Sequence, residues 1–419
     1  RATHVVLFLI LVFQTFLANI GASQIVSVGI HATPETNPEL VEAIPPIEFL
    51  GFDVTLIGIF FMIRLVRQQE YELIDYRNLL LSLIAWNILA IGRGVISASS
   101  YWDWKFLLFT NMPTLLVPLS ALLGSNIHSI GRLLRFIFPF YFILAFLTLL
   151  PIGVHLIAYL WTPLYFLILC LPYMTRKQKI MVLILIAVVF AAYFEGRSST
   201  IRICVALVIA FSYRFIINYT RFFFALHKVL FVLPIVFFIL GVTGSFNIFN
   251  MQSYIDSEVV VEGAAGATEN MLADTRTFLY QETLTSMNKH NSFLFGEGGC
   301  GKYESLAFKN DLFGAYRYAS EVGVLNTLLY SGIIGVLLYA LVFYKASRLA
   351  ICQSNNVLTK LIGLFVIFRW DYFFVEEFTK FNTNFFFLWL MIGMCLSPTF
   401  RNMSDEEIEN LIVNGEYEK

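Results

Sequence analysis

Residues 222–244 read FFFALHKVLFVLPIVFFILGVTG, an apolar run interrupted near its start by the basic pair His227 and Lys228. An α-helix rises about 1.5 Å per residue, so a run of this length can cross a hydrocarbon layer of about 30 Å. Runs of similar character recur along most of the chain. The stretch therefore predicts one of many membrane-spanning helices.

Composition supports this interpretation. Hydrophobic residues make up 58% of the chain and charged residues 14%, and the mean hydropathy is +0.73. No water-soluble surface could hide that much apolar area. We predict an all-α polytopic membrane protein of about twelve transmembrane helices. The predicted spans lie near 4–22, 47–66, 78–98, 105–123, 134–150, 153–173, 180–195, 199–217, 222–244, 321–343, 354–369 and 384–399.

The connections between these spans differ in basic charge. Cytoplasmic connections are enriched in Lys and Arg, whereas 23–46 and 150–153 contain neither. We therefore predict that both termini are cytoplasmic. The basic residues expected on the cytoplasmic side are Arg64, Arg67, Arg77, Arg132, Arg135, Arg176, Lys177, Lys179, Arg214, Arg221, Lys345 and Arg348.

The longest polar segment, residues 246–320, should then lie outside the cytoplasm as one large loop. It divides the predicted helices into a first set within 1–245 and a second within 321–400. Residues 401–419 form an acidic cytoplasmic tail. A net charge of −1 gives no sign of a nucleic-acid partner, and the five scattered cysteines show no zinc spacing. Function is therefore sought at the loop.

The loop contains a string that resembles a phosphate-binding loop. Gly296-Glu-Gly-Gly-Cys-Gly-Lys302 has the G-x4-G-K spacing, but Tyr303 stands where a Ser or Thr hydroxyl would bind Mg²⁺. Two alternatives remain, a turn whose glycines adopt positive φ and a backbone nest for another phosphate. The nearby His290-Asn291 pair is interpreted as incidental.

Arginine at the outer ends of the predicted spans suggests an anion site. Arg197 and Ser198 lie between two apolar runs, and Arg202 follows about one turn later. A guanidinium offers a planar set of donors that suits a lipid diphosphate. Arg93, inside a predicted span, and Arg276, in the loop, are further candidates for substrate binding. The alternatives are lipid-headgroup anchoring and, for Arg93, a pair with a neighbouring acid.

The end of the loop carries a second group of candidates. Arg317 precedes the next span by a few residues, and Tyr316 and Tyr318 flank it, in positions suited to interface anchoring or sugar stacking. Glu321 is either a general base or a first-turn acid in a helix capped by Ser320.

A further group of charged residues lies at and just after the end of the predicted span 354–369. It contains Arg369, Asp371, Glu376, Glu377 and Lys380, as local ion pairs or as groups facing the same site.

Several of these motifs resemble the bacterial O-antigen polymerase (Wzy) and O-antigen ligase superfamily. The likeness rests on many spans with one late, large loop, on Gly196-Arg-Ser-Ser-Thr200, and on Leu294-Phe-Gly-Glu-Gly298 followed by Ser320-Glu-Val-Gly-Val-Leu325 and Leu328-Leu-Tyr-Ser-Gly-Ile-Ile-Gly335. Ligases carry a His-Asn pair where this chain has Glu321-Val322. That departure favours a polymerase over a ligase and leaves the base in doubt.

The resemblance implies a GT-C-like helical bundle in the bacterial inner membrane. It further implies that a polyprenyl-diphosphate-linked oligosaccharide is the donor, that a second one is the acceptor, and that a chain-length regulator is a possible partner. Arg197, Arg317 and Glu321 are the catalytic candidates. We expect no cofactor and no metal, since the loop has no Asp-x-Asp string. A flippase of lipid-linked glycans is the rival hypothesis.

Overall fold

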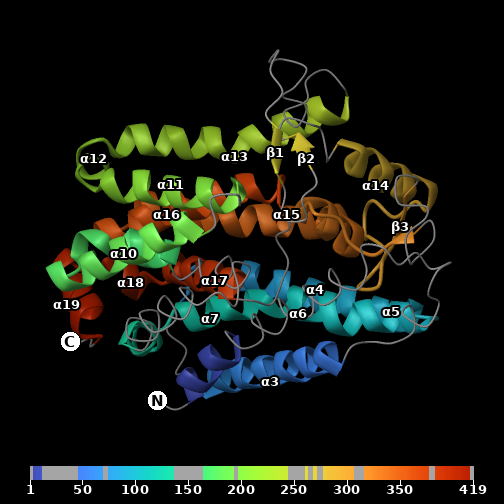
Figure 1. Cartoon of the computed structure of the whole chain (residues 1–419), viewed down its shortest axis with the longest axis horizontal. Coiled ribbons are helices and arrows are strands. Elements are labelled where there is room, and N and C mark those ends of the chain that lie inside the picture. Colours follow the sequence, from blue (N-terminus) through green and yellow to red (C-terminus); the bar gives the residue numbers. More distant parts are fainter. Residues whose placement is uncertain are drawn as a thin grey trace.

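The computed structural model describes residues 3–11, 46–68, 74–135, 164–192, 197–243, 260–262, 268–270, 277–305, 316–376 and 383–415. Helices make up most of these residues and run roughly along the long axis of the molecule (Figure 1). The first half contains α3 (Pro46–Gln68), α4 (Arg77–Ser97), α5 (Tyr101–Phe106), η1 (Leu107–Asn111), α6 (Met112–Leu116), η2 (Val117–Leu119), α7 (Ser120–Gly124), η3 (Leu171–Tyr173), α10 (Arg176–Ala192) and α11 (Arg197–Phe211).

The second half contains α12 (Tyr213–Asn218), α13 (Thr220–Val242), α14 (Thr277–Lys289), α15 (Gly323–Cys352), α16 (Val357–Tyr372), α17 (Thr383–Leu396), α18 (Pro398–Asn402) and α19 (Asp405–Asn414). Two small antiparallel sheets accompany the loop. One pairs β1 (Val260–Glu262) with β2 (Thr268–Asn270), with Val261 opposite Glu269. The other pairs β3 (Tyr303–Glu304) with β4 (Tyr316–Arg317), with Tyr303 opposite Arg317.

Four helical stretches among the described residues are long and apolar enough to cross a membrane: Arg77–Ser97, Tyr101–Gly124, Thr220–Val242 and Gly323–Cys352. Each overlaps a predicted span, although Gly323–Cys352 ends nine residues beyond the predicted 321–343. Shorter apolar helices cover Leu164–Tyr173, Thr200–Phe211 and Thr383–Leu396. The chain is thus an all-α protein with helices suited to a membrane. The predicted span at 134–150 lies almost entirely outside the described residues.

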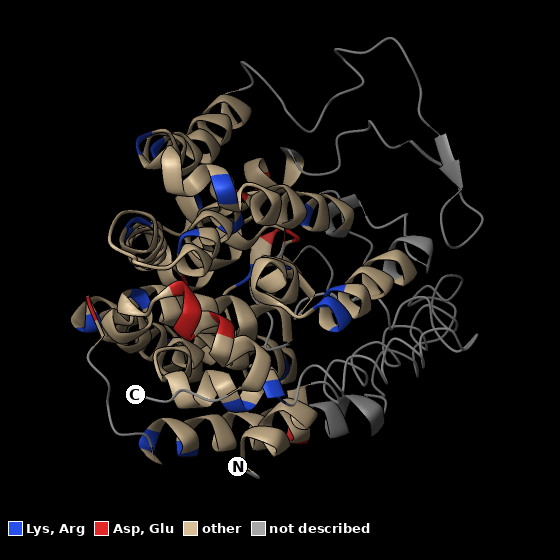
Figure 2. Ribbon diagram, turned by 90° about the vertical axis from the view of Figure 1, so that its left-hand side faces the viewer, with Lys and Arg blue, Asp and Glu red and all other residues tan. Residues whose placement is uncertain are grey.

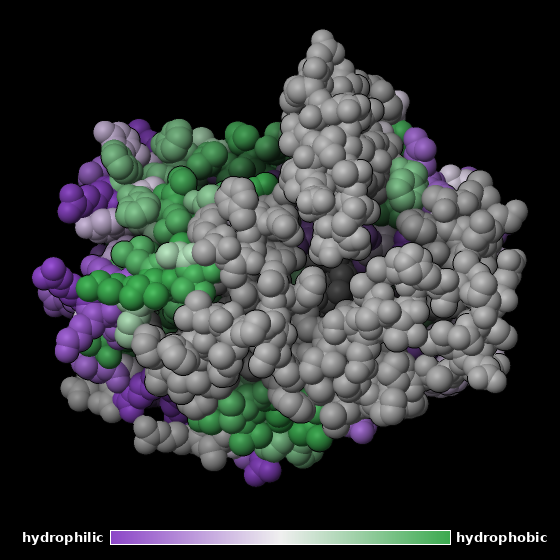
Figure 3. All heavy atoms as spheres, in the orientation of Figure 1, coloured by the Kyte–Doolittle hydropathy of each residue, from purple (hydrophilic) through white to green (hydrophobic). Residues whose placement is uncertain are grey.

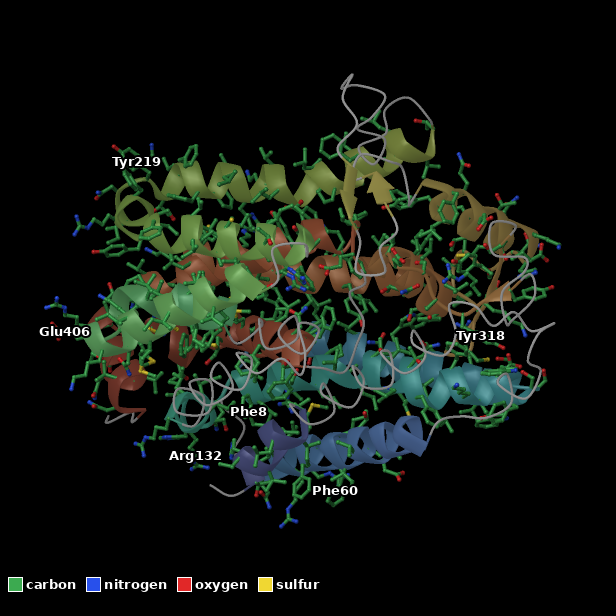
Figure 4. The ribbon with its side chains drawn as sticks, in the orientation of Figure 1. Phe8, Phe60, Arg132, Tyr219, Tyr318 and Glu406 are labelled. Atoms are coloured by element: carbon green, nitrogen blue, oxygen red, sulfur yellow. The ribbon has the colours of Figure 1, made fainter. Side chains whose placement is uncertain are left out.

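The connections gather at two opposite ends of the bundle. At one end, Arg401 pairs with Asp75, and the Arg135 Nε donates to Asn414 O at 2.8 Å. Figure 2 looks at this end, where Lys and Arg mark several helix ends, and Figure 4 places Tyr219 and Glu406 there. Tyr318 lies toward the other end (Figure 4), as do α14 and β3 (Figure 1). Hydrophobic residues cover the flank of α11 and α13 between the ends (Figure 3).

Small residues allow close helix packing in the core. A Cβ on Gly124 would lie 2.1 Å from Leu390 O, and one on Gly393 would lie 2.0 Å from Ala121 O. Helices in membranes approach closely where such small residues face each other. These glycines therefore fix the contact between α7 and α17.

Helix α15 is broken in its first half, at its tenth residue. Gly332 has φ 68° and ψ −172°, a backbone conformation open almost only to glycine. A Cβ added to Gly335, one turn later, would lie 2.3 Å from the Ser331 Cβ, so the bend is sharp. A break of this kind leaves backbone N–H and C=O groups without helical partners. Hydrogen bonds from these groups to residues 293–298 hold that segment against α15.

Candidate functional site

Residues 293–301, here called the glycine loop, dock onto the break in α15. Glu297 N donates to Leu329 O at 2.6 Å, and Gly298 N donates to Tyr330 O at 3.2 Å. In the reverse direction, Ile333 N donates to Phe293 O at 2.8 Å. Leu294-Phe-Gly-Glu-Gly298 and Leu328–Gly335, two motifs far apart in the chain, therefore form one hydrogen-bonded joint.

Helix α4 holds the other side of the glycine loop. The Arg93 guanidinium donates to Phe295 O and Gly296 O, each at 2.5 Å. Gly299 N donates to Ala90 O at 2.7 Å, and a Cβ on Gly94 would lie 2.7 Å from Gly299 N. The close approach of the two backbones therefore requires glycine at position 94.

A buried carboxylate anchors the segments on either side of residues 306–315. Asp103, in α5, is 2% exposed and accepts from Tyr318 OH at 2.8 Å and from the Lys302 Nζ at 3.2 Å. The Tyr318 ring stacks on Phe106 at 4.2 Å between centroids. Burial and the hydrogen bond to Asp103 raise the pKa of the Tyr318 phenol. Tyr318 is therefore a buried structural residue that attaches the end of the loop to α5.

Two arginines are buried between helices near the loop end. Arg202 in α11 is 5% exposed, and its Nη1 lies 2.9 Å from the Glu376 Oε2. Arg369 in α16 is 1% exposed, and its Nη1 donates to the Asn384 Oδ1 at 2.9 Å. Among the described residues, the Nε of Arg369 has no hydrogen-bond partner. We call Arg202, Arg369, Glu376 and Asn384 the arginine site.

The charged groups of the arginine site act on one another. The charge of Glu376 acts on both guanidinium groups, and the two guanidinium groups repel each other. Burying a charge is costly unless it is paired. An anion that entered here would be stabilised by both cations.

Residues of α14 and α15 contact the segment after α16 that carries Glu376. The Tyr280 hydroxyl of α14 donates to Phe374 O. Gly323 N, at the start of α15, donates to Glu376 O at 2.9 Å. Hydrogen bonds from α14 and α15 therefore hold the segment that supplies Glu376 to the arginine site. Two aromatic rings also line the site: the Arg202 guanidinium lies 5.7 Å from the ring centroids of both Tyr165 and Tyr372.

The structure brings together only part of the predicted set. Arg202 joins the arginine site, whereas Arg93 grips loop carbonyls. Arg197 and Ser198 begin α11, but their side chains lie outside the described residues, as does all of Arg276.

At the end of the loop, Arg317 is half-buried in β4, opposite Tyr303. Tyr316 is 40% exposed, Glu321 is also exposed, and the ring of Tyr318 is covered by Phe106. Tyr318 thus presents no free ring for sugar stacking in this structure.

Two local predictions are wrong. Helix α15 begins at Gly323 with Val322 as its cap residue, so Ser320 does not cap it and Glu321 is not in its first turn. Instead, Ser320 N donates to the Asn326 Oδ1 at 2.7 Å. Asn326 reaches back across the helix start, and this contact displaces the cap. The turn interpretation of the glycine string is confirmed at Gly296 and Gly298, which have φ of 71° and 89°.

For Arg369 and Glu376 the sequence left two alternatives, local ion pairs and groups facing the same site. The sequence signal for a buried site was Arg369 in the last turn of an apolar run, because a buried arginine needs a partner. Among the described residues, no group of three His, Cys, Asp or Glu side chains could hold a metal ion. Comparison with family models, curated proteins and solved structures gives no match.

Proposed function

We propose that the chain is a membrane glycosyltransferase that polymerises polyprenyl-diphosphate-linked oligosaccharides at the outer face of a bacterial inner membrane. In this proposal about twelve helices span the membrane, both termini are cytoplasmic, and residues 246–320 form one outer loop. The observation that carries it is the arginine site, in which Arg202 and Arg369 are 5% and 1% exposed and both interact with the charge of Glu376. Ionised side chains inside a membrane usually mark a substrate pathway.

The reaction is a displacement at the anomeric carbon of the donor sugar. An acceptor hydroxyl forms the new C–O bond while the bond to the diphosphate oxygen breaks, and the electron pair leaves with the diphosphate. The hydroxyl proton passes to a base, for which exposed Glu321 is our candidate. Arg202 and Arg369 stabilise charge on the leaving group, as preorganised donors do in other enzymes. Arg197 and Arg317 remain candidates for the same role.

Charge removal at the arginine site tests this proposal. We expect Arg369→Gln to shorten the polysaccharide made in the native host and to lower turnover roughly 100-fold or more, the usual effect of losing one such donor. Arg202→Gln should act similarly. Arg214→Gln is the matched control, because Arg214 lies in α12 at the opposite end of the bundle. Full-length polymer from both site variants, at normal membrane abundance, would refute the site assignment.

One observation favours a transporter as a second candidate. Helix α15 is broken at Gly332, and discontinuous helices line substrate sites in many transporters. The two functions differ in their need for a bilayer. A transferase lengthens glycans in detergent, whereas a flippase has no measurable activity there.

A further inference from the structure

We propose that the glycine loop enters the bilayer from the outer side and that Leu294 and Phe295 contact lipid hydrocarbon. The inference rests on the membrane placement in the proposed function and is independent of its chemistry. Both side chains are exposed, at 53% and 52%. In a loop surrounded by water, two adjacent exposed apolar side chains of this size would be unfavourable.

The depth of the loop follows from its contacts with α4. This helix has 21 residues and is therefore about 31 Å long, close to the thickness of the hydrocarbon layer. Its outer end is followed by Tyr101 and Trp104, which are 54% and 40% exposed, and such aromatic residues concentrate at the membrane interface. The Phe295 ring lies 6.0 Å from the ring of Trp86. Trp86 precedes Ser97 by eleven residues, about 16 Å along the helix.

The surface beside the loop is apolar on both helices. On α4, Ile88 and Leu89 are 53% and 58% exposed. On α15, the residues at helical spacing after the break are also exposed: Ile333 at 43%, Leu337 at 56% and Leu341 at 43%. The apolar loop tip adjoins these faces because its backbone is hydrogen-bonded to α15 and its Phe295 ring contacts Trp86 of α4.

The carbonyl groups of the loop largely meet the condition that a bilayer imposes. Non-helical backbone at membrane depth must have its polar groups satisfied within the protein. The carbonyl oxygens of residues 292–296, 298 and 299 all accept hydrogen bonds. The donors are Gly296 N, Ile333 N, Ile334 N, the Arg93 guanidinium, Gly301 N and Asn111 Nδ2. A loop in water would not need this degree of internal pairing.

This placement also explains Arg93. A charge inside a membrane usually pairs with another charge or with backbone carbonyls. Arg93 donates hydrogen bonds to two backbone carbonyls of the glycine loop. The water boundary lies just before the loop, because the Lys289–Glu304 ion pair leaves Lys289 61% exposed. The segment thus descends after α14, turns beside α4 and α15, and returns at Lys302.

Spin labels measure this depth directly. In a variant whose five native cysteines are replaced, Leu294→Cys and Phe295→Cys would be labelled separately and reconstituted in phosphatidylcholine vesicles. Leu337→Cys provides the lipid-facing control, and Tyr316→Cys the outer-loop control. Power saturation with oxygen and with a water-soluble nickel chelate then reports the local solvent.

We expect the ratio of oxygen to nickel accessibility at residues 294 and 295 to match that at residue 337. It should exceed the ratio at residue 316 several-fold. A ratio at both loop positions equal to that at residue 316 would overturn loop insertion while leaving the transferase proposal intact. Nickel accessibility at residue 337 as high as at residue 316 would overturn the membrane placement and the inference together.

Discussion

Gly332→Ala should break the joint between the glycine loop and α15. Gly332 has φ 68° and ψ −172°, and forcing a residue with a side chain into that conformation costs about 1–3 kcal/mol. An added Cβ would also lie 2.3 Å from Leu294 O and 2.6 Å from Gly296 N. Because both atoms belong to the backbone, the loop must move away rather than rotate a side chain.

The displaced loop would lose hydrogen bonds across the joint. Four backbone bonds span it, two from loop N–H groups and two to loop carbonyls. Each contributes roughly 1 kcal/mol net, so losing two to four of them adds about 2–4 kcal/mol. We therefore expect a total destabilisation of about 3–7 kcal/mol, combining this loss with the backbone strain.

Equilibrium unfolding in mixed detergent micelles measures this loss, with limited proteolysis of residues 293–305 as a second readout for local release. Gly241→Ala is the control, because a Cβ there meets nothing within 4 Å. Alanine in a helix interior is favoured over glycine by about 0.5–1 kcal/mol, so the control should be neutral or slightly stabilised. Equal stability and equal protease resistance in the two variants would refute the reasoning about the joint.

Two further predictions concern the anchors of the loop. Asp103→Asn removes the charge that holds Lys302 and weakens the bond from Tyr318, so the loop should be cut faster by added protease, with a local loss of about 1–3 kcal/mol; unchanged cleavage would contradict the anchoring role. Glu304 beside Lys289 has a lowered pKa, so its ion pair is complete above pH 4.5 and is lost as the pH falls through the lower folded value. The raised pKa of Lys289 preserves the pair up to pH 10.5 and beyond, until the pH passes the higher folded value. Hydrogen exchange at β3 that is independent of pH across both limits, after correction for intrinsic rates, would argue against this pairing.

The helices could be predicted because length and apolar character determine them. Arg77–Ser97 and Thr220–Val242 agree with the predicted spans to within two residues. The start of α15 was less predictable, because Asn326 binds Ser320 from within the helix and shifts the cap. A helix cap is predicted from residues within about one turn of the helix start, whereas the hydrogen bond between Ser320 and Asn326 joins residues more than one turn apart.

The candidate site was only partly predictable. Arg93 and Arg202 were recognisable as arginines within or beside apolar runs, because such a charge needs a partner. Their partners could not be foreseen: Arg93 binds backbone carbonyls, which have no signature in the sequence, and Arg202 pairs with Glu376 far along the chain. The glycine loop itself docks through backbone groups, so Gly296, Gly298 and Gly332 were its main visible sign.

The most direct test of the proposed function is a transfer assay with the purified chain in detergent. The substrate is a polyprenyl-diphosphate-linked oligosaccharide repeat unit, supplied without nucleotide and without a bilayer. The proposal predicts a ladder of longer glycans, each step releasing one polyprenyl diphosphate, and a greatly reduced ladder with Arg369→Gln. Unchanged substrate with folded wild-type protein, or an identical ladder from the variant, would contradict it.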